Sequence, residues 1–248
     1  IKYDAMTGAV LWSVTFDSGG GNFDETFGVV IGADGHPVVT GFTCSPAFDF
    51  CDVRTIKYDG ATGAVLWNVT FDSGGTNMDQ ALSVAVGADG HPVVAASNCD
   101  PTFTFCSFRT IKYDGSTGTI IWSTTFGGVV NDNGVGVAIG PDGHPIVTGY
   151  SCTSAFAGCD IRTIKYDGTT GAILWNVTFD SGFEDQGFAI GIGPDGHPVV
   201  GGMTCASIDP VFLNCDFRVI KYDGTTGAVL WNVTFNSGGG NNDAFSSV

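Results

Sequence analysis

The chain has 248 residues, of which only 14% are charged, and its formal net charge is −16 because 25 acidic residues outnumber 9 basic ones. Nucleic acids and anionic lipid headgroups are bound through clustered Lys and Arg, so this charge balance argues against a nucleic-acid partner and against a role at a membrane surface. No stretch approaches the roughly 18 apolar residues that a membrane-spanning helix requires, and we expect no membrane insertion.

One unit of 53 to 56 residues is repeated along the whole chain. Its marker is the phrase Ile-Lys-Tyr-Asp, followed each time by a Thr-Gly turn and a Trp, and it begins at Ile1, Ile56, Ile111, Ile164 and Ile220. A period of about 50 residues is typical of propellers, solenoids and arrays, whose units stack because none of them can bury its own apolar faces. We therefore expect a single repeat domain over residues 1–248.

In chain order, the sequence predicts a partial unit, four complete units and a second partial unit. The partial units are 1–16, with two strands, and 243–248, with one incipient strand, and the complete units are about 22–71, 77–126, 131–179 and 183–235. Because the chain begins and ends within repeats, we expect it to be a piece of a longer repetitive protein.

The sequence of each complete unit predicts four strands and no helix. In the second unit the expected strands are 81–86, 92–97, 108–113 and 119–126. Gly in the connecting turns accepts the positive φ that hairpins require, and the strands are rich in Val, Ile, Thr, Phe and Trp. Four antiparallel strands in a meander form a propeller blade. The predicted fold class is all-β, a β-propeller of four-stranded antiparallel blades with partial blades at both ends and about five blades if the ring closes.

The eight Cys fall into four local pairs between the same two predicted strands of each unit. We expect disulfides between Cys44 and Cys51, Cys99 and Cys106, Cys152 and Cys159, and Cys205 and Cys215. The repeat makes pairing between neighbours the simplest of the possible connectivities, and no CxxC spacing indicates zinc. Local disulfides indicate an oxidising setting, so we expect an extracellular or cell-surface protein.

Three segments carry a resemblance to a known family. Asp132 to Gly149 (DNGVGVAIGPDGHPIVTG), Arg109 to Asp114 and Trp122 to Gly128 resemble the seven-bladed β-propeller repeat family of secreted bacterial and archaeal surface proteins. The resemblance covers essentially the whole chain and implies a propeller fold, although only four complete units are present rather than seven. It implies no particular reaction, because propellers host many unrelated functions.

A second, weaker resemblance is to the repeats of quinone-dependent alcohol dehydrogenases. It rests on the phrase Tyr-Asp-x-x-Thr-Gly-x-x-Leu-Trp, clearest at 222–231. The resemblance would imply a quinone cofactor, a calcium site and adjacent Cys residues in a much longer chain. Neither adjacent Cys residues nor a unique acidic cluster is present, so we predict no cofactor-binding residues.

The His and the basic residues sit at repeated positions. Each His occupies an Asp-Gly-His-Pro turn, at positions His36, His91, His144 and His197. A ring of imidazoles could bind a metal, but repetition alone explains the placement, and we predict no His metal site. The basic residues on the third strands are Arg54, Arg109, Arg162 and Arg218, with Lys2, Lys57, Lys112, Lys165 and Lys221. We expect them to pair with carboxylates of the neighbouring sheet, the candidates being Asp24, Asp79, Asp132, Asp185 and Asp243.

Three further features suggest sites. The Gly-rich loops 17–24 and 72–79 collect oxygen ligands that calcium prefers, but we favour the interpretation that they are solvated connections, and we predict no cofactor. Asn-Val-Thr sequons on the outermost strands predict glycosylation at Asn68, Asn176 and Asn232. Aromatic residues in the Cys loops predict an assembly contact, or else a satellite core; they are Phe48, Phe50, Phe103, Phe105, Phe156 and Phe212.

The functional expectation is a non-enzymatic extracellular structural or adhesive module, the subunit of a surface filament assembled through loops or strand exchange. Its partners would be other copies of itself, forming a homopolymer, or surface glycans and proteins. A glycan- or protein-binding lectin-like propeller is the alternative, and a quinone-dependent enzyme is less favoured. Catalysis normally gives one blade a unique set of reactive residues, and because the His, Cys and basic residues here are all repeated, we predict no catalytic residues.

Overall fold

A computed structural model describes residues 1–127, 130–154, 157–207 and 213–236. These residues form eighteen strands, and no helix long and apolar enough to cross a membrane is found among them. The prediction of an all-β propeller of four-stranded antiparallel blades is confirmed. The predicted strand at 243–248 lies outside the described residues.

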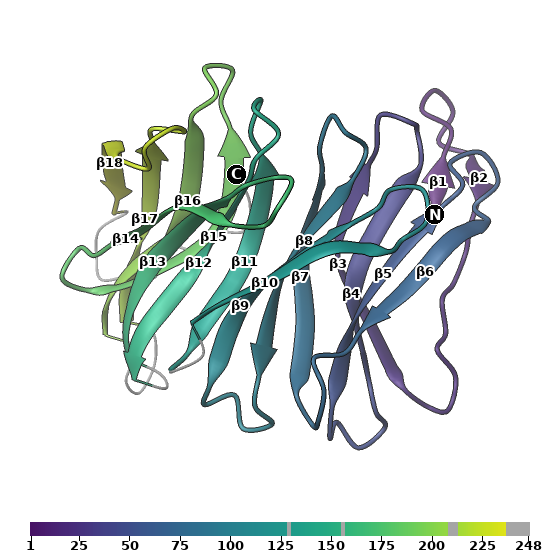
Figure 1. Cartoon of the computed structure of the whole chain (residues 1–248), viewed down its shortest axis with the longest axis horizontal. Helices are drawn as coiled ribbons and strands as arrows, with labels where there is room; N and C mark the ends of the chain where they lie inside the picture. Colours follow the sequence, from purple (N-terminus) through teal and green to yellow (C-terminus); the bar gives the residue numbers. More distant parts are fainter. Residues whose placement is uncertain (128–129, 155–156, 208–212, 237–248) are drawn as a thin grey trace.

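The strands form one hairpin and four blades, which Figure 1 shows in a row from the hairpin at one end to the last blade at the other. The hairpin is β1 (Lys2–Tyr3) and β2 (Val10–Trp12). The first blade is β3 (Phe23–Ile31), β4 (Pro37–Cys44), β5 (Cys51–Tyr58) and β6 (Val65–Phe71). The second is β7 (Met78–Val86), β8 (Pro92–Cys99), β9 (Cys106–Tyr113) and β10 (Ile120–Gly127).

The other two blades follow the same order. The third is β11 (Asp132–Ile139), β12 (Pro145–Ser154), β13 (Ala157–Tyr166) and β14 (Ile173–Phe179). The fourth is β15 (Glu184–Ile192), β16 (Pro198–Ser207), β17 (Leu213–Tyr222) and β18 (Val229–Phe235). Consecutive strands within each blade pair antiparallel. A single parallel pair, Cys51 with Met78, joins the first two blades into one eight-stranded sheet.

The first strand of the second blade begins earlier than the sequence predicted. β7 starts at Met78 rather than at residue 81, because its first residues pair with the end of β8, where Met78 lies opposite Cys99 and Asp79 opposite Asn98. The polar residues of the Gly-rich loop therefore enter the sheet. This extension brings Asp79 into a buried position between two blades.

The apolar core lies between blades rather than within them. At the junction of the first two blades, Val38, Val53 and Trp67 pack against Val94 and Ile111 of the next blade. Both faces of an inner blade are covered in this way, which explains why the strands are apolar on both sides. Burial of apolar surface is favourable by about 25 cal/mol per Å², so the blades stabilise one another.

Candidate binding sites

At each junction, one backbone carbonyl of the following unit accepts two hydrogen bonds from the preceding unit. At the first junction between complete blades, Lys57 Nζ and Trp67 Nε1 both donate to the Gly115 carbonyl oxygen, at 2.7 and 3.1 Å. The same pair of donors recurs from Lys2 and Trp12 to Gly60, from Lys112 and Trp122 to Gly168, and from Lys165 and Trp175 to Gly224. The Lys side chains therefore connect neighbouring blades.

The prediction of which carboxylates pair with the Lys residues was wrong. Lys57 pairs with Asp34 of its own blade, with Nζ 2.7 Å from Oδ2, and that hydrogen bond lowers the pKa of Asp34. Asp34 lies in the turn between β3 and β4. Because β4 pairs with both β3 and β5, this turn lies beside the part of β5 that carries Lys57. Lys112, Lys165 and Lys221 make the equivalent pairs with Asp89, Asp142 and Asp195.

The Arg side chains pack on aromatic rings of the preceding blade. The guanidinium carbon of Arg109 lies 5.0 Å from the ring centroid of Phe71, and Arg54, Arg162 and Arg218 lie 5.1 to 5.2 Å from Phe16, Phe126 and Phe179. Burial lowers the pKa of Arg109, and the nearby charge of Asp79 opposes this shift. Arg109 therefore has the expected carboxylate of Asp79 nearby, and its guanidinium group also makes a cation–π contact with Phe71.

Each of the four His side chains makes a hydrogen bond to a turn of its own blade. His36 Nδ1 accepts a hydrogen bond from the Gly60 backbone N–H at 2.9 Å, and His91, His144 and His197 do the same for Gly115, Gly168 and Gly224. That nitrogen is therefore occupied. Among the described residues, no His belongs to a group that could hold a metal.

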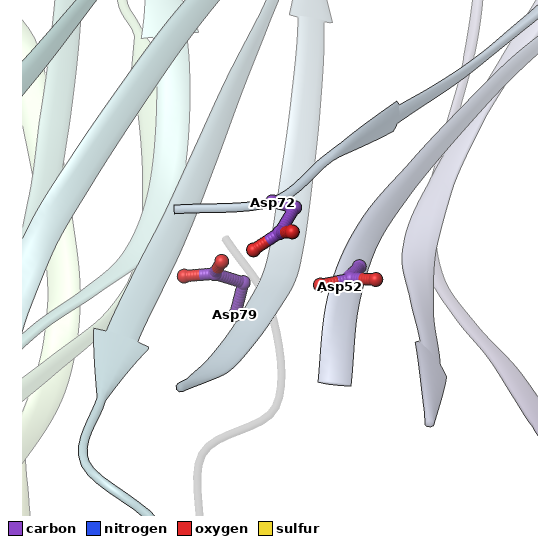
Figure 2. Close-up of side chains that lie close together, drawn as sticks. All are labelled: Asp52, Asp72 and Asp79. Carbon is purple, nitrogen blue, oxygen red and sulfur yellow. The ribbon is translucent and has the colours of Figure 1, made fainter. Parts of the chain in front are cut away.

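Carboxylates do gather at two of the junctions. In Figure 2, Asp52 from β5, Asp72 after β6 and Asp79 from β7 converge on one point between the first and second blades, with one oxygen of each within 4.8 Å of the others. Burial raises the pKa of Asp79 and of Asp52, and the charge of Asp72 adds to the shift at Asp52. Asp79 is buried, and it accepts from the Ser73 N–H and from Asn98 Nδ2.

The same acid triad recurs between the third and fourth blades as Asp160, Asp180 and Asp185. Burial, together with the charges of Asp180 and Asp185, raises the pKa of Asp160 to about 6. The junction between the second and third blades has Ser107 and Gly127 in place of the first two carboxylates and keeps only Asp132. The described residues therefore contain two complete acid triads and one junction that has a single carboxylate at the corresponding positions.

The donor set of these triads fits a hard divalent cation, since calcium and magnesium prefer carboxylate oxygens. The sequence pattern pointed to the loop 72–79, whereas nothing in it singled out Asp52, Asp160 or Asp180 as candidate ligands. The missed signal is the Asp that directly follows the second Cys of a pair, as in Cys51-Asp52 and Cys159-Asp160. In the loop 17–24, Asp24 instead accepts hydrogen bonds from Ser18 and from Thr43.

The Cys loops are braced as expected. The four neighbour pairs form disulfides, Cys44 with Cys51, Cys99 with Cys106, Cys152 with Cys159, and Cys205 with Cys215. Four disulfides indicate an oxidising environment, extracellular or periplasmic. Of the aromatic residues in these loops, Phe48, Phe50, Phe103 and Phe105 are exposed, and Phe48 packs beside Phe23 with ring centroids 5.3 Å apart. Phe156 and Phe212 lie outside the described residues.

The sequon residues Asn68, Asn176 and Asn232 lie exposed on the outermost strands. Their side-chain oxygens accept from Arg54, Arg162 and Arg218 Nη1 at 3.0 to 3.1 Å. Within the described part of the chain, their Nδ2 atoms make no hydrogen bond. The amide nitrogen that a glycan would modify therefore faces solvent.

A pocket of about 850 Å³ lies between the hairpin β1–β2 and the first complete blade. Trp12 of the hairpin forms one wall, and the opposite wall includes Val29, Ile31, Val39 and Ile56. The counterparts of these residues in the second blade lie at the junction with the first blade. Val29 is 66% exposed, whereas its counterpart Val84 is 9% exposed. This pocket is therefore the place where a blade face lacks the inner strands of a neighbour.

Comparison with solved structures shows the propeller fold. The GH93 α-L-arabinofuranosidase of Fusarium graminearum with arabinobiose has a TM-score of 0.61 at 9% identity, over 88% of this chain and 68% of that chain. BamB from Moraxella catarrhalis has a TM-score of 0.43 at 14% identity, over 85% and 62%. A quinohemoprotein alcohol dehydrogenase from Pseudomonas putida has a TM-score of 0.47 at 16% identity, over 82% and 41%.

These comparisons contradict two expectations from the sequence, namely that the chain is not an enzyme and that it is a structural or adhesive module or filament subunit. The similar propeller with a TM-score of 0.61 is an enzyme, the GH93 α-L-arabinofuranosidase, rather than a structural or adhesive protein. At 9 to 16% identity, the comparisons show the fold alone and assign no reaction to this chain.

No curated protein is significantly similar to the chain in sequence. One family model does match, over residues 58–247, and its description is outer membrane protein assembly factor BamB, PQQ_2. The match spans most of the chain and includes every blade after the first three strands of the first one. The chain therefore belongs to this BamB-like family of propeller repeats.

Proposed function

We propose that this chain is a secreted β-propeller module that binds an extended polypeptide of a partner protein in the pocket between β1–β2 and the first complete blade. The observation that carries the proposal is the uncovered face of that blade. Val29 and Ile31 are 66% and 62% exposed, although the equivalent face of each following blade is packed against β-strands.

The shape of the pocket favours a β-strand over a compact ligand. In the first complete blade, β4 pairs with β5 so that Val38 lies opposite Lys57. Among the described strands, the equivalent residue Lys2 of the hairpin pairs only with Trp12 of β2. The inner edge of β1 therefore has backbone groups available to an added strand, and addition of a strand to a sheet edge is a common mode of peptide recognition.

The chemistry of the pocket walls supports the same occupant. Val39, Ile56 and Tyr58 provide an apolar wall, whereas Asp24, Glu25 and Arg54 lie at the polar part of the lining. An extended peptide with alternating apolar and polar side chains matches such a surface, because successive residues of a strand point to opposite faces. The description of the family as an outer membrane protein assembly factor is in keeping with a protein partner.

The test uses a synthetic peptide with the sequence of residues 22–43, which carries the two strands that fill this position in a complete blade. Titration of the 248-residue chain with this peptide, followed by calorimetry, should show saturable binding. Val29→Asp places a charge in the pocket and should weaken binding by more than about tenfold. Leu66→Asp, at an exposed residue that does not line the pocket, should leave binding unchanged. Equal binding of a scrambled peptide, or of Val29→Asp, would overturn the proposal.

We also propose that the acid triads Asp52–Asp72–Asp79 and Asp160–Asp180–Asp185 bind calcium. The supporting observation is that three carboxylates share a partly buried site at two junctions, where burial raises the pKa of Asp52, Asp79 and Asp160. A divalent cation would offset the repulsion among these charges. Three carboxylates supply fewer than the six to eight oxygens that calcium takes, so waters would complete the coordination.

A further inference from the structure

Every outermost strand that the structure describes exposes two consecutive aliphatic side chains. In the third blade, which packs against a blade on each side, Ile173 and Leu174 are 42% and 49% exposed. The equivalent residues of the other units are 42 to 58% exposed: Val10 and Leu11, Val65 and Leu66, Ile120 and Ile121, and Val229 and Leu230. The exposure is therefore a property of each blade and does not depend on the place of that blade along the chain.

A β-bulge explains why both side chains remain exposed. The bulge of β14 lies opposite Lys165 and Tyr166 of β13, and it leaves Leu174 out of the pairing between the two strands. Beyond the bulge, Trp175 is buried and Asn176 is exposed. Because residues i and i+2 of a strand lie on the same face, Leu174 and Asn176 are neighbours on the exposed face, about 7 Å apart along the strand.

The Asn of this pair belongs to an Asn-Val-Thr sequon, and an Arg holds its amide group in one orientation. Arg162 Nη1 donates to Asn176 Oδ1 at 3.1 Å, and the guanidinium group itself packs on Phe126 of the preceding blade. A guanidinium group has only donors, so the amide oxygen must face it, and Nδ2 points away. The same contacts hold Asn68 and Asn232.

We propose that N-linked glycans at Asn68, Asn176 and Asn232 are part of the folded structure, because the first sugar of each glycan packs on the Leu two residues earlier. A pyranose ring presents C–H groups on its faces, and covering the exposed Leu surface removes apolar area from water. The three Leu residues are Leu66, Leu174 and Leu230. This role goes beyond the presence of a glycan, and it is independent of the peptide pocket and of the acid triads.

The covalent step is an ordinary glycosyl transfer. Asn Nδ2 forms a bond to the anomeric carbon of the first sugar of a lipid-diphosphate-linked oligosaccharide. The bond from that carbon to the diphosphate oxygen breaks, the lipid diphosphate leaves, and Nδ2 loses one proton. The amide oxygen takes no part in the transfer, so the hydrogen bond from Arg162 to Asn176 Oδ1 is retained in the glycosylated chain.

The second blade provides an internal comparison. Ser123 stands in the place of Asn176, and its hydroxyl accepts from Arg109 Nη1 at 3.3 Å. Ile121, two residues earlier, is 43% exposed. This blade therefore has the exposed aliphatic side chain and the Arg but no amide, and Ser123→Asn would complete a sequon with Thr125.

The test compares melting temperatures of the 248-residue chain secreted from a eukaryotic host that glycosylates sequons. One sample carries intact glycans, and a second is trimmed by an endoglycosidase to one N-acetylglucosamine per site. A third sample is the variant without sequons, Thr70→Val with Thr178→Val and Thr234→Val. The intact and trimmed forms should melt together, because the first sugar makes the contact. The variant should melt about 2 to 4 °C lower. Mass spectrometry measures the occupancy of each sample.

Three controls separate the sugar contact from the substitutions. Val keeps the β-branched shape of Thr, so wild type and the Thr→Val variant should melt alike when both come from a bacterial host without this modification. Replacing the three Leu residues by Thr keeps every sequon and should reduce the glycan-dependent difference by more than about half, since the contact partner is lost. Ser123→Asn should gain a fourth glycan and a further rise in melting temperature, in the glycosylating host only.

Four results would overturn the proposal. Unmodified wild-type chain from the glycosylating host would remove the glycans themselves. Glycosylated chain that melts like the variant without sequons would leave the glycans in place but remove their contact with the fold. A trimmed form that melts like that variant would show that the first sugar is not the stabilising part. A full glycan-dependent difference after Leu→Thr replacement would exclude the Leu side chains as the contact.

Discussion

The indole ring of Trp67 lies directly against the backbone of Gly118 in the next blade. A Cβ added to Gly118 would be 2.9 Å from Cδ2 of Trp67, which is too close for two carbon atoms, and Gly118 has a φ of 75°. Glycine is therefore required twice at this position, once for the backbone conformation and once for the close approach of the ring.

Gly118→Ala should consequently destabilise the fold by about 2 to 4 kcal/mol, as the sum of a positive-φ cost and overpacking. Gly8→Ala is the matched control, because Gly8 has a similar φ of 70° but nothing within 4 Å of an added Cβ. It should cost only the backbone part, about 1 to 2 kcal/mol. Urea unfolding of both variants measures the difference, and equal losses would contradict the ring contact.

Lys57→Met should lower the free energy of unfolding by about 1.5 to 3 kcal/mol, since hydrogen bonds to charged groups contribute that much. The Lys57 ammonium group is buried and contacts both Asp34 and the Gly115 carbonyl. Lys221→Met is its control, because the Lys221 side chain is more exposed and has only the contact with Asp195 among the described residues. Its loss should stay below about 1 kcal/mol, as for an exposed ion pair. Thermal unfolding of dilute protein compares the two variants, and a larger loss for Lys221→Met would refute this account of the junction.

Calcium should raise the melting temperature of the wild-type chain if both acid triads bind it. The double variant Asp52→Asn with Asp160→Asn removes one carboxylate from each triad and should abolish the shift. Asp132→Asn, at the junction that has Ser107 and Gly127 in place of the other two carboxylates, should keep it. Differential scanning calorimetry with calcium, and with a chelator as reference, is the measurement. A wild-type chain whose melting temperature is the same in calcium and in chelator would contradict the calcium proposal.

The raised pKa of Asp160 predicts a pH effect with a definite sign. Its pKa is about 6 in the folded chain and near 3.8 in the unfolded chain, so between these values the folded state holds more protons than the unfolded state. Stability from this group is therefore present at low pH and is lost as pH rises toward 6. Asp160→Asn cannot ionise, so its melting temperature relative to the wild type should increase from pH 4 to pH 6. A difference that stays constant over this range would show that Asp160 ionises normally.

Asn68, Asn176 and Asn232 should be modified when the chain is secreted from a host that glycosylates Asn-x-Ser/Thr sequons. All three side chains are exposed on outermost strands, and the second blade provides an internal negative, because Ser123 takes the place of Asn68. Intact mass spectrometry should show three occupied sites that disappear one at a time in Asn→Gln variants. A single unmodified mass for the wild-type chain from such a host would exclude these sites.

Repetition is what made the fold predictable. Because Trp, Cys, Lys and the Asp-Gly-His-Pro turn recur at one period, the strands of a blade and its disulfide could be placed from any single unit. The partners of Lys57 and Arg109 could not be predicted from one unit. The choice between a turn carboxylate, a carbonyl and an aromatic ring depends on how far one blade is displaced along the next. The sequence predicted a carboxylate of the neighbouring sheet for both. The structure shows Asp34 of the same blade and the Gly115 carbonyl for Lys57, and for Arg109 it shows Phe71 in addition to the nearby charge of the predicted Asp79.

The all-β blades, their order along the chain and their neighbouring disulfides could be predicted from the sequence, since these depend on local alternation, turns and short loops. Which residues meet between blades depends on how the blades pack, and this became known from the structure. Asp52, Asp72 and Asp79 come from β5, from the loop after β6 and from β7, in two blades, and the exposure of Val29 and Trp231 depends on what lies beside the first and last blades. Contacts of this kind join residues far apart in the chain. A repeated sequence has the same residue at equivalent positions whether or not a neighbouring blade buries that side chain.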